Sequence, residues 1–166
     1  VGNVMIDNLF YQAVKLDGDV PGRFPTSDIK EKLGDYAFLT IHRPSNVDTK
    51  PAFCEIAEAL NIIAANMPIL FPVHPRTKKM MNEFKIRLSD NISLFSPLSF
   101  KESLFLWKDA RVVLTDSGGL REETTALGVP CVTIRENTER PITIKMGTNI
   151  LAGTKKESIL KAFEEA

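Results

Sequence analysis

Short apolar runs rich in β-branched residues alternate with longer segments of helical periodicity along most of this chain. This alternation is typical of a parallel sheet whose connecting helices cover both faces. The expected strands are Tyr36–Ile41, Ile69–Val73, Ile92–Ser96, Val112–Thr115, Cys131–Ile134 and Asn149–Ala152. The expected helices are Pro51–Ala65, Thr77–Leu88, Lys101–Lys108, Gly119–Leu127, a short segment after Pro141, and Lys156 to the end. We therefore expect an α/β fold with a Rossmann-like, doubly wound parallel sheet.

The 166 residues are enough for a single domain with its own hydrophobic core. Asn3–Val14 has the apolar spacing of a helix, and Asp17–Ser27 is rich in Gly, Pro and Asp. Residues 1–30 are therefore expected to form a linker helix and loop before the first strand. Because the chain begins on a helix without a preceding strand, we expect it to be a piece of a longer protein.

Charge and composition exclude several classes of function. Lys plus Arg and Asp plus Glu number 21 each, so no overall field favours nucleic acid or an anionic membrane. No apolar run approaches the roughly 20 residues that span a bilayer, and the N-terminus lacks a secretory pattern. We expect a soluble, cytoplasmic protein. Cys54 and Cys131 are isolated in apolar surroundings and are predicted to be small buried hydrophobes, with a catalytic thiol as the alternative.

A glycine turn follows the expected strand that ends at Thr115. It reads Asp116-Ser117-Gly118-Gly119 and leads into a helical segment. The N–H groups at a helix N-terminus lack intrahelical partners, and glycines let an anion approach the main chain closely. Ser117, Gly118 and Gly119 are thus candidates for binding phosphate. The alternative is an ordinary turn in which glycine only provides an unusual φ angle.

Two other expected strands end in a histidine accompanied by an arginine. His42 and Arg43 follow the first strand, and His74 follows the second, two residues before Arg76. Groups of this kind at one sheet edge favour a shared anionic ligand. The alternative for the first pair is a histidine packed under a loop and an Arg43–Asp48 ion pair. A metal site is not expected, because the chain has only 2 histidines and no carboxylate at helical spacing from them.

A polar loop follows the fifth expected strand, with Arg135 and Arg140 on either side of it. Arg140 is a candidate ligand-binding residue, and its alternative is a solvated ion pair with Glu139. On the helix after the glycine turn, Glu123 lies about one turn in, where its carboxylate could accept hydrogen bonds from a vicinal diol such as a ribose. Glu122 is interpreted as a first-turn carboxylate that complements the helix dipole.

The polar clusters together resemble the non-hydrolysing UDP-N-acetylglucosamine 2-epimerases. The resemblance covers nearly the whole chain from the Gly2–Asp7 segment onward. The clusters that carry it are Thr40-Ile41-His42-Arg43 with Asn46-Val47-Asp48, His74-Pro75-Arg76, Asp116 to Glu123, Thr138 to Pro141, and Gly147-Thr148-Asn149. It implies a glycosyltransferase-B type fold of two Rossmann-like domains with the active site between them. This chain is similar to the C-terminal domain.

The resemblance also implies roles for individual residues. Ser117 and Gly119 would hold phosphate, Arg140 would contact the nucleotide or pyrophosphate, and Glu123 would bind the ribose hydroxyls. His42 matches the family's active-site histidine. Arg43 and His74 match residues that some bacterial members use for a second, activating UDP-sugar. Base recognition is expected to fall to main chain, because Leu98 stands in the loop where contacts to uracil would lie.

In the family, UDP is eliminated to give 2-acetamidoglucal and is added back after protonation of C2 on the other face. UDP-N-acetylglucosamine (UDP-GlcNAc) and UDP-N-acetylmannosamine (UDP-ManNAc) are interconverted without a cofactor. Because the acid and base carboxylates come from the N-terminal domain, the resemblance implies that this chain alone is inactive. The implied partners are UDP-GlcNAc, UDP and the N-terminal domain, with a homodimer for the full-length protein.

Related readings of the same motifs stay open at this point. Epimerases of diacetamido uronic acid nucleotides and hydrolysing epimerases carry similar motifs. A UDP-sugar glycosyltransferase would also use a Gly-Gly helix and a ribose-binding glutamate. A module that binds a nucleotide sugar without catalysis is the alternative from another class.

Overall fold

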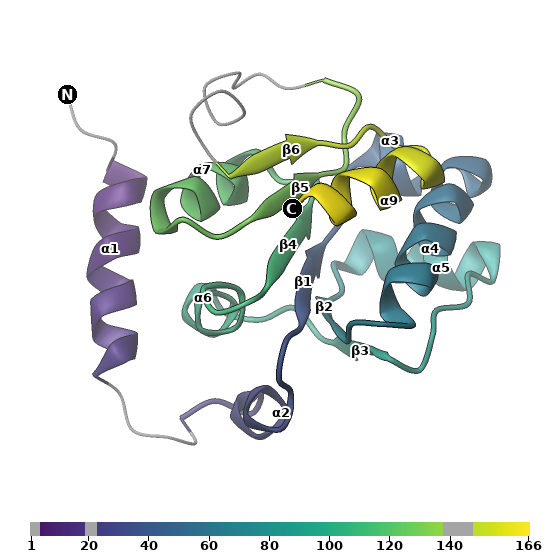
Figure 1. Cartoon of the computed structure of the whole chain (residues 1–166). Helices are drawn as coiled ribbons and strands as arrows, with labels where there is room; N and C mark the ends of the chain where they lie inside the picture. The colour runs from purple at the N-terminus through teal and green to yellow at the C-terminus, as the bar shows by residue number, and fades with distance from the viewer. Residues whose placement is uncertain (1–3, 19–22, 138–147) are drawn as a thin grey trace.

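The computed structural model describes residues 4–18, 23–137 and 148–166, and Figure 1 shows its α/β architecture. The helices are α1 Val4–Asp17, α2 Ser27–Lys32, α3 Pro44–Val47, α4 Lys50–Ala64, α5 Pro75–Phe84, α6 Phe100–Trp107, α7 Gly118–Leu127 and α9 Lys156–Glu165. The strands are β1 Ala37–Thr40, β2 Ile69–Pro72, β3 Ile92–Phe95, β4 Val112–Thr115, β5 Cys131–Thr133 and β6 Asn149–Leu151.

These strands form one sheet in the order β3-β2-β1-β4-β5-β6, and every neighbouring pair is parallel. The chain first builds the sheet outward from β1 through β2 to β3. It then returns to the other side of β1 and builds outward from β4 to β6. This strand order is that of a doubly wound Rossmann sheet, as the sequence predicted.

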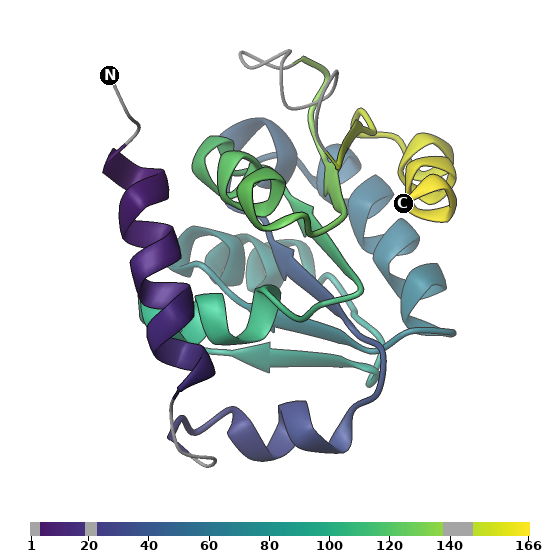
Figure 2. The same ribbon diagram turned by 60° about the vertical axis from the view of Figure 1, so that its left-hand side comes forward.

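The alternation of side chains along β1 divides the core into two clusters. Ala37 and Leu39 pack with the apolar residues of α4 and α9, whereas Phe38 points to the other face and packs with α1 and α6. Figure 2 shows helices on both sides of the sheet. Trp107 lies in the second cluster and is 1% exposed. The chain therefore has its own core on each face of the sheet.

The structure adds elements and shifts bounds relative to the predictions. The β4 strand has the predicted bounds, but the first helix continues to Asp17, and a second helix, α2, begins at Ser27. The α5 helix begins at Pro75, since a proline is well suited to the first turn of a helix. It ends at Phe84, before Lys85, whose φ of 54° is left-handed, so the predicted extension to Leu88 is wrong.

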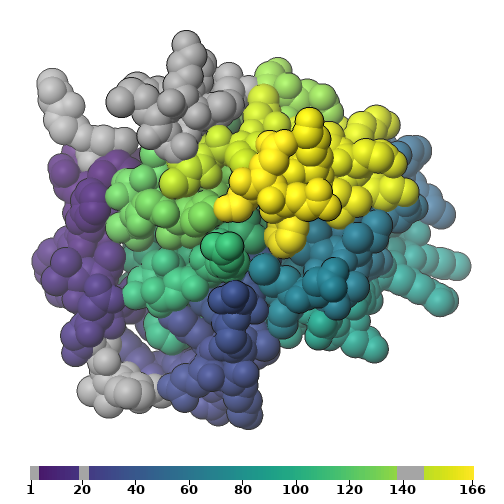
Figure 3. All heavy atoms as spheres, in the orientation of Figure 1, coloured from purple at the N-terminus to yellow at the C-terminus, as the bar shows by residue number. Residues whose placement is uncertain are grey.

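The α1 helix lies along one flank of the molecule (Figure 3). It buries Leu9 and Leu16, while Val4, Tyr11 and Val14 are exposed. At its C-terminal end, Asp17 accepts a hydrogen bond from Lys108 at 2.8 Å. The α1 helix thus packs against the same folded body as the sheet.

Candidate functional site

The candidate site lies at the carboxyl edge of the sheet between β1 and β4. The chain changes its winding direction between these two strands, and ligands of doubly wound folds bind in the crevice beyond such a switch point. Thr40 and Thr115 end the two strands in register, and their hydroxyl oxygens lie 2.7 Å apart. The residues that follow them, from Ile41 and from Asp116, therefore emerge side by side.

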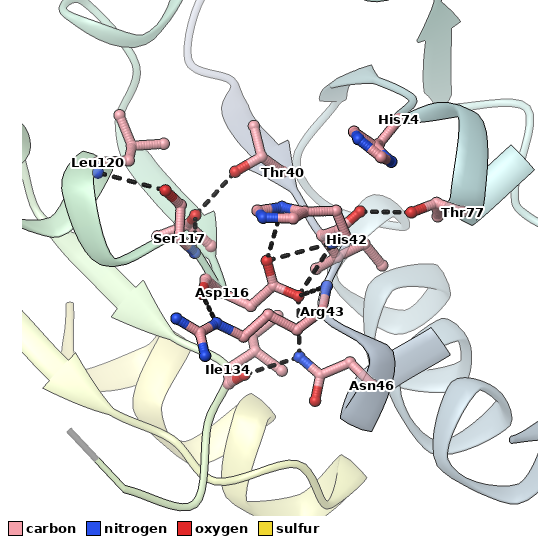
Figure 4. A network of polar contacts seen from close by, with 12 residues as sticks. Thr40, His42, Arg43, Asn46, His74, Thr77, Asp116, Ser117, Leu120 and Ile134 are labelled. Carbon is pink, nitrogen blue, oxygen red and sulfur yellow. Dashed lines mark hydrogen bonds and ion pairs between the residues drawn. The ribbon is translucent and has the colours of Figure 1, made fainter. Parts of the chain in front are cut away.

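Asp116 is the centre of a polar network that joins the two strand ends (Figure 4). It is fully buried, and its carboxylate accepts the main-chain N–H of His42 at 3.0 Å and of Arg43 at 2.8 Å. Its oxygens also lie 3.1 Å from Asn46 Nδ2 and 3.2 Å from His42 Nδ1. The loop after β1 is thus held by one carboxylate at the end of β4.

The contact between His42 and Asp116 changes the pKa of both groups. The hydrogen bond to Asp116 raises the pKa of His42, against the opposing effects of burial and of Arg43. Burial raises the pKa of Asp116, but hydrogen bonds from His42 and from the main-chain N–H groups outweigh it and hold this pKa below its ordinary value. The arrangement favours an imidazolium beside a carboxylate.

The arginine after His42 does not pair with Asp48, so the predicted alternative for Arg43 is wrong. Arg43 Nε donates to the main-chain oxygen of Asp116 at 2.8 Å. Asp48 instead accepts two hydrogen bonds from Arg76, from Nε to Oδ1 at 2.7 Å and from Nη2 to Oδ2. Asp48 directly follows α3, Arg76 lies in the first turn of α5, and both side chains are partly exposed.

Ser117 is the N-cap of α7, and its hydroxyl accepts a long 3.5 Å hydrogen bond from Leu120 N–H. Gly118 and Gly119 form the first helical positions. Among the described residues, the glycines with positive φ are Gly128 and Gly153, so the turn before α7 does not need glycine for its conformation. A Cβ at Gly118 or at Gly119 would meet its nearest neighbour at 3.6 Å, an ordinary contact.

Glu122 and Glu123 lie beyond the first turn of α7, because the helix begins at Gly118. The interpretation of Glu122 as a first-turn carboxylate is therefore wrong. Burial, and after it the charge of Glu122, raises the pKa of Glu123. A half-buried carboxylate of this kind is ready to accept a hydrogen bond from a ligand hydroxyl.

A cavity of about 260 Å³ opens beside the network. It is lined by Thr40, Ile41, His42, Pro72, His74, Pro97, Leu98, Ser103, Ser117 and Leu120. The rings of His42 and His74 lie 5.5 Å apart, so the two histidines converge as the sequence predicted. His74 also caps α5, since its Nδ1 accepts the N–H of Arg76 at 3.2 Å.

The structure gathers only some of the predicted site residues around this cavity. His42, His74 and Ser117 line it, whereas Arg43, Glu123 and the two glycines of α7 are not among its lining residues. Arg135 is buried at the end of β5. Arg140 lies outside the described residues, as does most of the predicted polar loop.

Sequence reasoning missed the roles of Asp116 and Asn46 in this site. Asn46 is fully buried and donates both to Asp116 and to the main-chain oxygen of Ile134, at 3.0 Å. It thereby joins α3 to the ends of β4 and β5. A polar residue directly after an apolar strand, as Asp116 is, was the signal that could have identified the network.

Further features of the described residues bear on other kinds of site. No group of three or more His, Cys, Asp or Glu side chains within the described ranges could hold a metal ion. None of the described helices is long and apolar enough to cross a membrane. Cys131 is buried, and burial raises its pKa to about 11, which is unsuited to a nucleophile. Cys54 is only partly buried.

Known proteins are similar to this chain in sequence and in fold. The family model of UDP-N-acetylglucosamine 2-epimerase matches residues 1–166. A UDP-N-acetylglucosamine 2-epimerase of Methanocaldococcus jannaschii is 45% identical over 136 residues, which are 78% of this chain and 37% of that protein. A UDP-2,3-diacetamido-2,3-dideoxy-D-glucuronate 2-epimerase of Pseudomonas aeruginosa is 32% identical over 98% of this chain and 43% of its own length.

A solved structure is similar over almost the whole chain. The crystal structure of the M. jannaschii UDP-GlcNAc 2-epimerase in complex with UDP-GlcNAc and UDP superposes with a TM-score of 0.87 and 37% identity. The match covers 99% of this chain and 46% of that one, so this chain spans less than half the length of these relatives. The chain belongs to the UDP-N-acetylglucosamine 2-epimerase family.

Proposed function

We propose that this chain is the C-terminal, UDP-binding domain of a UDP-GlcNAc 2-epimerase with a glycosyltransferase-B type fold. The observation that carries the proposal is the pair Gly118 and Gly119 at the start of α7. Glycine destabilises a helix relative to alanine, and neither the φ angles nor the packing of the domain require it here. Close approach of a phosphate to the main chain would explain why glycine occupies both positions.

In this proposal the pyrophosphate of UDP lies at the first turn of α7, and Ser117 helps to hold it. Glu123 binds the ribose hydroxyls from the next turn of the same helix. His42 lies across the switch point and faces the reacting end of the ligand. Arg140 contacts the nucleotide, while Arg43 and His74 bind a second, activating UDP-sugar.

The full-length protein would interconvert UDP-GlcNAc and UDP-ManNAc. A base removes the C2 proton, and the C1–O bond breaks so that UDP leaves with the bonding electron pair and 2-acetamidoglucal forms. A proton then returns to C2 from the other face as UDP adds back to C1. Groups that bind the departing pyrophosphate stabilise this charge separation.

The acid and base carboxylates of this reaction belong to the remaining domain in our proposal. This chain alone is therefore expected to bind UDP without epimerising it, and the complete protein is proposed to act as a cytoplasmic homodimer. The similarity to a diacetamido-glucuronate 2-epimerase supports a second candidate substrate, the corresponding UDP-uronic acid. Both substrates require the same UDP site in this domain.

Calorimetric titration of UDP into this chain tests the proposed site. Glu123→Ala should weaken UDP binding by about tenfold or more, the loss expected for a hydrogen bond to a charged group. Glu122→Ala removes the same charge from the neighbouring position of α7 and should leave the affinity within about twofold. Equal losses in both variants would contradict the ribose contact. No binding to the unsubstituted chain would contradict the proposed UDP domain.

A further inference from the structure

The His42–Asp116 contact constrains the imidazole more than a surface ion pair would. The Asp116 carboxylate is fully buried and is already fixed by two main-chain N–H groups and by Asn46. It cannot turn toward another partner without breaking these bonds. The 3.2 Å contact to Nδ1 therefore sets which ring nitrogen of His42 faces the protein.

A carboxylate that is ionised can only accept a hydrogen bond, so Nδ1 of His42 must carry a proton in this contact. A histidine free in water has no such restriction. The other nitrogen, Nε2, is left for a ligand, because His42 lines the cavity and its side chain is 42% exposed. Figure 4 shows the ring between the ends of β1 and β4 with Asp116 beneath it.

The charged and titratable groups near the ring come from three elements of the described chain. Asp116 follows β4, Arg43 belongs to the same loop as His42, and His74 follows β2 with its ring 5.5 Å away. The side chain of Arg43 is directed to the main-chain oxygen of Asp116. The Nδ1 of His74 is occupied by the α5 cap. Asp116 is thus the group that determines the hydrogen bonding of His42.

We propose that Asp116 is a positioning residue, which holds His42 with Nδ1–H toward its own carboxylate so that Nε2 meets a phosphate oxygen of UDP. The second half of this inference rests on the proposed function, whereas the first concerns the protein without ligand. Held in this way, His42 donates from Nε2–H when the ring is protonated. The donor would thereby stabilise the departing UDP.

Nuclear magnetic resonance of ¹⁵N-labelled imidazole rings tests the first half directly. The chain has only 2 histidines, so a His74→Gln variant assigns both signals. Above its titration midpoint, neutral His42 should carry its proton on Nδ1, opposite to the Nε2–H tautomer that predominates for free imidazole side chains. A neutral His42 with its proton on Nε2 would overturn the positioning role, and this measurement needs no Asp116 variant.

Asp116→Asn then shows whether the carboxylate is the cause. The amide N–H would face Nδ1, so the neutral ring should change to the Nε2–H tautomer and its titration midpoint should fall. Asp90→Asn, the same change at an exposed position, should leave the His42 signals unchanged. Retention of the Nδ1–H tautomer in a folded Asp116→Asn protein would overturn the inference.

Titration with UDP and with uridine separates this inference from the proposed function. UDP should raise the midpoint of His42 by bringing a phosphate to Nε2, whereas uridine should leave it unchanged. Binding of UDP without a shift at His42 would overturn the phosphate contact alone. If UDP does not bind, both the proposed function and the phosphate contact are contradicted. The positioning role is still tested by the tautomer of His42 in the protein without ligand.

Discussion

The two histidine loops have similar sequences and different structures. Each follows a parallel strand, and each combines a histidine, an arginine and a proline within three residues. His42 is held by a buried carboxylate at the end of β4, whereas His74 caps its own helix and Arg76 pairs with Asp48 near the surface. Of the two strands that precede these loops, β1 lies next to β4 and β2 does not, so only the first loop reaches Asp116. Position in the sheet, more than residue type, decides which loop is fixed in place.

The largest expected effect is a loss of stability when Asp116, but not Asp48, is replaced by asparagine. Asp116→Asn should lower the free energy of unfolding by roughly 2–4 kcal/mol, because the buried N–H donors around it lose a charged acceptor. Asp48→Asn makes the same chemical change at a solvent-exposed pair and should have little effect on the unfolding midpoint. Urea unfolding followed by the fluorescence of Trp107, the single tryptophan, measures both. Comparable losses would show that the two loops are equally fixed.

The next effect concerns UDP affinity. His42→Gln should weaken binding by about tenfold, the equivalent of one hydrogen bond to a charged group. His74→Gln should change it by less than about threefold, because His74 is assigned to a second, activating ligand. Calorimetry on both variants makes the comparison. A larger loss in His74→Gln would reverse the assignment of the two histidines.

A smaller loss of stability is expected when the hydrogen bond between the two histidine segments is removed. Thr77, in the first turn of α5, donates its hydroxyl to the main-chain oxygen of Ile41 at 2.6 Å, and the contact is buried. Thr77→Val should cost about 1 kcal/mol of stability. As the control, Thr125→Val removes a bond within α7, from Thr125 to the Arg121 carbonyl, and should cost less. If the Thr77→Val protein were as stable as the unsubstituted protein, this hydrogen bond would not be needed to hold the two loops together.

The smallest effect is the dependence of stability on pH. The pKa of His42 is higher in the folded protein than its ordinary value of 6.5. Its contribution to stability is therefore fully present below about pH 6.5 and is lost as the pH rises through the folded pKa. The stability difference between the unsubstituted protein and His42→Gln should shrink over this range. A difference that grows with pH would contradict the raised pKa.

The sequence predicted the fold class, because the alternation of strand and helix patterns is a local signal. It also placed the two histidines at one edge of the sheet. It did not predict that Arg76, not Arg43, pairs with Asp48, because this choice depends on how α5 packs beside the β1 loop. The role of Asp116 depends on β1 and β4 being neighbours, and periodicity along the chain does not specify the order of strands.

The separation of the two strand ends in the sequence has a consequence for folding. His42 and Asp116 are 74 residues apart, so their contact closes a long loop that spans β2, β3 and the intervening helices. At ribosomal rates the intervening residues take about 4–15 s to synthesise. During that interval the histidine loop exists without the carboxylate that fixes it. The candidate site is therefore completed only after Asp116 has been synthesised, and a nascent chain that ends before Asp116 cannot assemble it.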